Sequence, residues 1–249
     1  PIRSFAKKFV AGLENGGRTV ASIAVVMACM GVVVQMMTAT GLSSKISQFA
    51  LSIAGDNLII LALVVALTCT LFGMGMPSAS AYILAALLGA PALVSFGVPL
   101  VVAHFFVFYF AEMSALTPPV AIGCLVASGL ANAKFLKTCV IALRLAIMGF
   151  VLPFLFLYRP ALLLQGTAFE WFWAVLMVVC FLFCFIIVCE KYFRIQTTLA
   201  ERIAAGVGAL CCIIPVYVMD FIGLALFLFL IVSQQRRVKR EGLASRSQA

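Results

Sequence analysis

The sequence predicts an all-α, polytopic inner-membrane protein with one re-entrant hairpin and one discontinuous helix. Of its 249 residues, 65% are apolar and only 10% are charged, against roughly 45–50% and about 25% in soluble domains. The apolar residues form long unbroken runs, and the alternating strands of outer-membrane barrels are absent. Because a helix needs about 20 apolar residues to cross a bilayer, the length allows roughly six to eight membrane elements. A soluble enzyme domain is excluded.

Charge and cysteine content exclude two further classes of protein. The net charge is +9, but the seventeen Lys and Arg residues lie mostly in short clusters beside apolar runs, which sets membrane orientation and does not form a nucleic-acid surface. The nine cysteines lie in or beside apolar runs, and the chain has one histidine, His104. We therefore expect packed thiols, no cofactor and no metal site formed by these residues.

The first membrane helix follows a basic N-terminal segment. Residues 1–19 place Lys7 and Arg18 around Phe5 and Phe9, which predicts an amphipathic arm helix on the membrane surface. The apolar run 20–37 then predicts a membrane helix. The chain begins without Met and shows no signal peptide, so we expect it to be the C-terminal portion of a longer protein.

A re-entrant hairpin is predicted over residues 57–89. The basic clusters should all face the cytoplasm, yet single crossings by 20–37, 57–89 and 98–131 would put Arg18 and Lys134 on opposite sides. Residues 73–80 read Gly-Met-Gly-Met-Pro-Ser-Ala-Ser, and glycine and proline break helices. We therefore expect arms 57–72 and 77–89 that enter and leave from outside. The other basic clusters are Lys134 with Lys137, then Lys191, Arg194 and Arg202, then Arg236, Arg237, Lys239, Arg240 and Arg246.

A broken helix is predicted over residues 98–131, because one straight helix would run about 50 Å. The break falls at Thr117-Pro118-Pro119. A helix over 135–158 completes a unit that spans residues 20–158. Residues 159–235 then predict extra membrane helices, including 170–189 and 203–232, and 236–249 predict a basic cytoplasmic tail. Pro215 and Asp220 interrupt 203–232, so this run is either one helix or a re-entrant pair.

Two breaks inside apolar runs favour a transport function. Non-helical backbone in lipid costs several kcal/mol per unpaired group unless it lies in protein or lines a wet cavity. At each break, free carbonyls suit a cation and free N–H groups suit an anion, as in secondary carriers. The structural alternative is that these residues only kink the helices, with Ser and Thr bonding carbonyls of their own helices.

Glu112 is a candidate for proton coupling because a carboxylate in an apolar helix defaults to a functional hypothesis. The alternative is that it bonds a neighbouring helix in neutral form. His104 lies eight residues earlier, on roughly the same helix face. Structural roles are expected for Arg144 and Asp220, and interfacial anchoring for Tyr158, Trp171 and Trp173.

Two motifs carry a family resemblance. Residues 73–82, followed by Leu116-Thr117-Pro118-Pro119-Val120-Ala121, resemble the large membrane subunit of tripartite ATP-independent periplasmic (TRAP) transporters over residues 16–165. The fused permeases of the TAXI branch are most similar, because the dicarboxylate and sialic-acid branches usually carry Asp where this chain has Pro77.

The resemblance implies one half of an inverted-repeat, elevator-type transporter, with the N-terminal half of the permease missing here. It implies coupling to Na⁺, with H⁺ as the alternative, uptake of an organic acid anion, and a periplasmic substrate-binding protein as partner. We hypothesise that the hairpin and the joint face each other around two adjoining sites. The ion site would use Gly73, Gly75, Met76, Ser78, Thr117 and Pro118, and the substrate site Pro77, Ser80, Ser114 and Pro119.

Two alternatives stay open from the sequence. One is a proton-coupled carrier that uses Glu112, and the other is a non-transporting membrane scaffold subunit. An intramembrane enzyme is disfavoured, because the embedded region contains no H-E-x-x-H or G-x-S-x-G motif and no Ser/Lys dyad. The substrate itself is not determined by these residues.

Overall fold

The structure is a computed structural model that describes residues 2–190 and 197–246. It is all-α over these residues and divides into two compact units, 1–150 and 151–249. The helices of the first unit are α1 (Ile2–Ala39), α2 (Leu42–Ala54), α3 (Leu58–Gly73), α4 (Ser78–Ser95), α5 (Leu100–Met113), η1 (Ser114–Leu116), α6 (Ile122–Leu130) and α7 (Phe135–Leu145). Helix α8 (Ile147–Tyr158) contains the boundary, and η2 (Pro160–Leu163), α9 (Ala168–Glu190), α10 (Leu199–Ile213) and α11 (Tyr217–Arg246) complete the second unit.

Within the described residues, four helical segments are long and apolar enough to cross a membrane: Ser78–Ser95, Phe135–Tyr158, Ala168–Glu190 and Tyr217–Arg236. A fifth span arises if Ala24–Ala39 and Leu42–Ala54, which meet at a 65° bend, count as one broken span; the same pair also fits a re-entrant loop. Helices α3 and α5 with η1 are apolar but shorter. The polytopic all-α expectation is confirmed for the described residues.

Helix α1 differs from its predicted form. It runs without interruption from Ile2 to Ala39, so the boundary expected between residues 19 and 20 is not a helix end. No proline interrupts this stretch, and Gly16 and Gly17 alone do not stop a helix.

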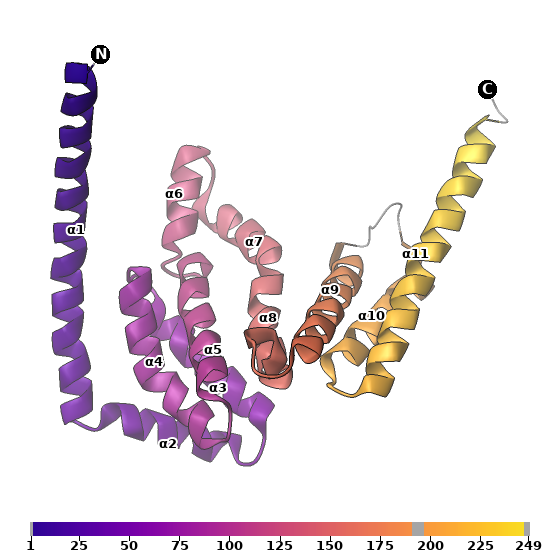
Figure 1. Cartoon of the computed structure of the whole chain (residues 1–249), viewed down its shortest axis with the longest axis horizontal. Helices are drawn as coiled ribbons and strands as arrows, with labels where there is room; N and C mark the ends of the chain where they lie inside the picture. The colour runs from indigo at the N-terminus through magenta and orange to yellow at the C-terminus, as the bar shows by residue number, and fades with distance from the viewer. Residues whose placement is uncertain (1, 191–196, 247–249) are drawn as a thin grey trace. The chain divides into compact units, whose positions relative to one another are not determined.

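Helix α2 was not predicted, because its serines, Lys45 and Gln48 interrupt the apolar pattern of its sequence. It follows a turn at Gly41, whose φ is +65°, and leaves α1 at the bend visible in Figure 1.

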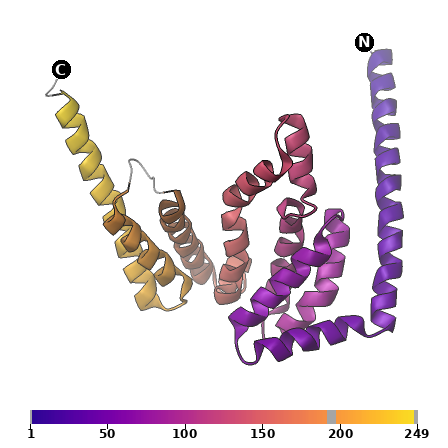
Figure 2. The same ribbon diagram turned by 180° about the vertical axis from the view of Figure 1, so that it is seen from behind.

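Helices α3, α4 and α5 form the core of the first unit. Figure 2 shows α3 and α4 side by side from behind. Asn57 caps α3 by accepting the Ile59 and Ile60 N–H groups. A Cβ on Gly89 would lie 2.7 Å from Val65 Cγ1 and 2.9 Å from Cys69 Sγ, so α4 approaches α3 closely only because residue 89 has no side chain.

Both predicted breaks are present. Helix α3 ends at Gly73 and α4 begins at Ser78, while α5 ends at Met113 and α6 begins at Ile122. Helix α4 continues through Pro91 to Ser95, six residues beyond the end predicted for the hairpin arm. Around these two breaks, several predicted site residues come together.

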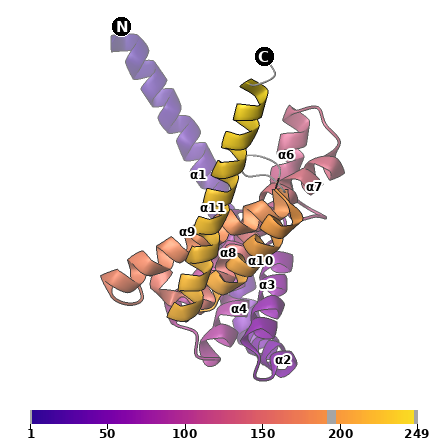
Figure 3. The ribbon, with the colours of Figure 1, turned by 90° about the vertical axis from the view of Figure 1, so that its right-hand side faces the viewer.

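The second unit is built on α9, α10 and α11, which pack together (Figure 3). Its buried core includes Leu155, Met177, Phe181, Ile187 and Leu230. The run 203–232 is two helices, because Pro215 lies in the turn between α10 and α11. Helix α11 continues to Arg246, so it carries helical structure into the predicted tail.

Candidate functional site: the hairpin tip and the broken-helix joint

The hairpin tip comprises residues 73–77, between α3 and α4. Gly75 has a φ of +80°, a left-handed conformation that favours glycine, and Met76 N–H reaches the Gly73 carbonyl at 3.4 Å. Pro77 is extended and leads directly into α4, whose first turn receives no side-chain cap. The N–H groups at the start of α4 are therefore left without a capping side chain.

The joint comprises residues 114–121, between α5 and α6. The 3-10 turn of η1 is followed by extended Thr117, a cis Pro118–Pro119 peptide bond and left-handed Ala121. Helix α6 also begins without a side-chain cap. Thr117 N–H bonds the Ser114 carbonyl at 3.2 Å, so one turn is kept before the chain leaves the helix.

The tip and the joint lie in direct contact. A Cβ built on Gly73 would lie 2.9 Å from Ser114 Oγ and 3.1 Å from the Ala111 carbonyl oxygen. A Cβ on Gly75 would lie 3.6 Å from Val120 Cγ1. The backbone of the tip therefore approaches the joint at residue 73 more closely than a residue with a side chain would allow.

A second contact joins the start of α4 to α5. Ser78 Oγ donates a hydrogen bond to Glu112 Oε2 at 2.8 Å, across 34 residues of sequence. The other carboxylate oxygen, Oε1, is buried and has no hydrogen-bond partner among the described residues. Of the predicted residues, Gly73, Ser78, Glu112 and Ser114 thus meet around the two breaks.

The predicted hydroxyls mostly donate to nearby backbone. Thr117 Oγ1 donates to the Met113 carbonyl at 2.8 Å, and Ser114 Oγ donates to the Ala111 carbonyl. These are the local bonds that the structural alternative expects. A hydroxyl that donates its proton keeps lone pairs on oxygen, so both groups remain able to bind a cation.

Other predicted residues lie further from the contact. Ser80 is fully buried and its hydroxyl approaches Met27 Sδ on α1 at 3.3 Å, not the joint. The Met76 side chain packs against the buried cluster of Met37, Leu84 and Leu88, not against the joint. Pro77 and Pro119 are exposed, and Pro118 is half-buried.

His104 forms a pair with α4. Its Nδ1 lies 2.9 Å from the Tyr82 hydroxyl, and Phe108 packs edge-on against the Tyr82 ring at a centroid distance of 5.6 Å. Helix periodicity puts His104 and Glu112 on roughly one face of α5, and both contact α4. No described contact links them to each other.

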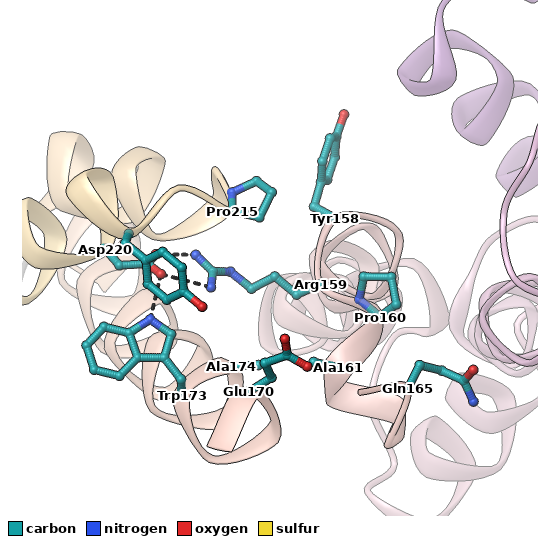
Figure 4. A pocket seen from close by; sticks show the side chains of 11 residues that line it. Tyr158, Arg159, Pro160, Ala161, Gln165, Glu170, Trp173, Ala174, Pro215 and Asp220 are labelled. Carbon is teal, nitrogen blue, oxygen red and sulfur yellow. Dashed lines mark hydrogen bonds and ion pairs between the residues drawn. The ribbon is translucent and has the colours of Figure 1, made fainter. Parts of the chain in front are cut away.

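Among the described residues, the buried charged side chains are Arg159, Glu201 and Asp220, all in the second unit, and only Asp220 was considered from the sequence. Arg159 and Asp220, which are 6% and 2% exposed, form an ion pair, and Trp173 Nε1 donates to Asp220 Oδ2 at 2.7 Å (Figure 4). Asp220 therefore has the structural partner expected of it, and Trp173 is more than an interfacial anchor. Arg159 was missed because a single basic residue directly after the apolar run 135–158 has the same local pattern as the charges that set membrane orientation.

Comparison with known protein families identifies the chain. Residues 3–172 match the family model of the tripartite ATP-independent periplasmic transporter, DctM component; no curated protein and no solved structure matches. The matched region contains the tip, the joint and Glu112. DctM components are multi-pass permeases of the bacterial inner membrane that carry out secondary transport with a periplasmic binding protein, which replaces the scaffold alternative. The chain therefore belongs to the DctM family of TRAP transporters and is a membrane permease, not an enzyme.

Proposed function

We propose that this permease couples the uptake of an organic acid anion to Na⁺, and that both bind where the hairpin tip meets the joint. The observation that carries the proposal is the close approach of Gly73 to Ser114. A Cβ atom added to Gly73 would lie only 2.9 Å from Ser114 Oγ. It brings the turn of the α3–α4 hairpin into contact with the break between α5 and α6. Polar backbone that is costly in lipid is thus gathered at one place.

The cation is held by neutral oxygens in this proposal. The last carbonyls of α3 lack partners further along the helix, and the hydroxyls of Ser114 and Thr117 keep lone pairs. Gly73, Gly75, Met76 and Pro118 contribute backbone oxygens, and Ser78 its hydroxyl. Such oxygen ligands suit a hard cation.

The anion is held by helix N-termini. Helices α4 and α6 both begin at a break and both lack a side-chain cap, so their first N–H groups and positive dipole ends are open to a carboxylate. Pro77, Ser114 and Pro119 line this part of the contact. Ser80, which faces Met27, enters the substrate site only if α1 moves.

We propose further that the chain is of the TAXI fused type and moves as an elevator with a second, inverted repeat. Pro77 at the hairpin, where the dicarboxylate and sialic-acid branches usually carry Asp, supports the branch. The pairing of one helical hairpin with one broken helix supports the repeat. Both proposals rest on the resemblance of the two motifs.

Replacement of Thr117 by Val tests the ion site. The valine keeps the shape of the side chain and removes the oxygen, so half-maximal uptake should require about tenfold more Na⁺, a loss of about 1.4 kcal/mol. Uptake is measured with the full-length transporter in liposomes with its binding protein. Thr68→Val is the control, because Thr68 makes the same 2.8 Å bond to its own helix, at Val64, away from the breaks. If the Na⁺ dependence of uptake by Thr117→Val is unchanged, Thr117 is not a ligand of the ion.

Glu112 supports one alternative, a proton-coupled carrier. Its buried Oε1 has no described partner, so it has room to accept a proton. Glu112→Gln keeps an oxygen for the Ser78 hydroxyl and removes the charge. If a pH gradient drives uptake by the wild type and Glu112→Gln abolishes that uptake, proton coupling is established. If a Na⁺ gradient drives uptake and Glu112→Gln leaves it unchanged, the leading proposal is supported.

A further inference from the structure

A cavity in the second unit has no part in the proposed transport site. Its volume is about 320 Å³, and its lining includes Tyr158, Arg159, Glu170, Trp173, Tyr217 and Asp220. Figure 4 shows the Glu170 carboxylate between Trp173 and the η2 segment, with the Arg159–Asp220 pair above them in this view. The family match ends at residue 172, so α9 from Trp173 onward, α10 and α11 lie outside the matched region.

Arg159 does not make this cavity an anion site. Its guanidinium donates two bonds to Asp220 and one each to the carbonyls of Cys212 and Ile214, the last two at 3.2 and 3.1 Å. The positive charge is therefore neutralised and its donors are directed into the protein. A ligand that enters the cavity meets a pair with no net charge.

Glu170 leaves the cavity with one net negative charge. It belongs to a capping box, in which Thr167 N–H donates to Glu170 Oε2 at 2.8 Å and Glu170 N–H reaches Thr167 Oγ1 at 3.3 Å. This cap occupies one carboxylate oxygen. Glu170 is exposed and forms no ion pair with another residue of the described ranges 2–190 and 197–246.

The walls of the cavity are aromatic. Trp173 is held by its bond to Asp220, and its ring lies 6.4 Å from that of Tyr217 between centroids. Tyr158 also belongs to the lining, but its side chain points away from Trp173 and Glu170 in Figure 4. A carboxylate beside aromatic faces is the arrangement that attracts an organic cation.

The cavity lies at the end of α9 that faces away from the basic residues. Glu170 and Trp173 are in its first turns, whereas Lys191, Arg194 and Arg202 follow its last turn in the sequence. Basic loops mark the cytoplasmic side, and Trp and Tyr gather at the level of lipid headgroups. The ligand would therefore enter the cavity at the non-cytoplasmic surface of the inner membrane.

We propose that this cavity binds a primary ammonium group, supplied by the headgroup of phosphatidylethanolamine. The ammonium donates to the Glu170 carboxylate and lies against the aromatic rings. The lipid is the favoured source because it places an ammonium group at this depth. The proposal is independent of the ion and substrate sites between tip and joint.

The two tryptophans of the chain make the test direct. They are Trp171 and Trp173, so in a Trp171→Phe protein the fluorescence reports on the cavity alone. Short-chain phosphatidylethanolamine is titrated into the purified full chain in detergent, in parallel with short-chain phosphatidylglycerol and with free ethanolamine. A saturable change with phosphatidylethanolamine, and none with phosphatidylglycerol, is expected.

Two variants then assign the binding to this cavity. Glu170→Gln keeps the capping box, which accepts Gln at this position, and should weaken binding about tenfold. Tyr217→Leu removes one aromatic face and should weaken it severalfold. Glu14→Gln, the same charge change on exposed α1, should leave binding unchanged. Equal binding of both lipids, or full binding by Glu170→Gln with intact helical content, overturns the proposal. Saturation by free ethanolamine at the same concentration would keep the ammonium site but overturn the lipid as its source.

Discussion

Ser78 at the start of α4 donates a hydrogen bond to Glu112 near the end of α5, with 2.8 Å between the oxygens. The bond ties the start of α4, next to the hairpin tip, to the broken helix two residues before its joint. It also uses one of the two carboxyl oxygens and leaves the other buried without a described partner. The position of the tip on the joint therefore depends on a carboxyl group that both coupling hypotheses have to account for.

Ser78→Ala should loosen the tip and reduce uptake. A hydrogen bond to a charged group contributes about 1.5–3 kcal/mol, so uptake in liposomes should fall about tenfold or more. Ser78→Thr retains a hydroxyl and should recover most of the loss. Ser52→Ala is the control, because Ser52 is exposed and bonds only the Phe49 carbonyl. Wild-type uptake by Ser78→Ala would show that the bond does not matter to transport.

Gly73→Ala should push the tip off the joint. The new Cβ would lie 2.9 Å from Ser114 Oγ and 3.1 Å from the Ala111 carbonyl, and overpacking costs about 1–3 kcal/mol. The purified protein should unfold at a lower temperature and transport poorly.

Gly31→Ala is the matched control for that change. A Cβ on Gly31 meets nothing within 4 Å, and alanine favours the helix by up to about 1 kcal/mol over glycine. Equal unfolding temperatures for the two variants would mean that the close approach at Gly73 is not maintained in the membrane.

Asp220→Asn should strongly destabilise the second unit. Loss of one partner of a buried ion pair costs about 3–5 kcal/mol because the other charge is left uncompensated. Arg159→Met combined with Asp220→Leu should recover much of this, since both charges are then removed. Glu14→Gln is the control, because it breaks an exposed ion pair with Arg18 that contributes only about 0.3–0.5 kcal/mol to stability. The measurement is thermal unfolding of the purified protein, and a double variant no more stable than Asp220→Asn contradicts the expectation.

Cysteine labelling from outside the cell tests whether α3 and α4 form a re-entrant hairpin. Asp56 precedes α3 and Ser95 ends α4, and both are exposed. With the nine native cysteines replaced by alanine, Asp56→Cys and Ser95→Cys should both react with a membrane-impermeant maleimide. Lys134→Cys, beside a predicted cytoplasmic cluster, should not. If only one of the two cysteines reacts with the reagent applied from outside, residues 56 and 95 lie on opposite sides and α3 and α4 together cross the membrane.

The sequence determined the class of the protein and the places where its helices break. Composition alone excludes a soluble domain, because too few polar residues are present to cover one. Gly75 and Pro77 mark the tip, and Pro118 and Pro119 the joint, because these residues restrict or free the backbone locally. Such effects act within one turn and are readable without knowledge of distant contacts. Helix α2 was missed because its buried face, formed by Ser47, Ala50 and Ala54, is defined only by its packing on α3 and α4.

The tertiary structure decided which of these residues meet. Ser78 and Glu112 are 34 residues apart, and Arg159 and Asp220 are 61 apart, so no local pattern pairs them. Packing of α3, α4 and α5 brings Gly73 against Ser114 and turns Ser80 toward Met27 instead. Likewise, Arg159 finds its acidic partner only through the turn between α10 and α11. Such contacts depend on how whole helices pack, and the residues that form them do not encode that packing locally.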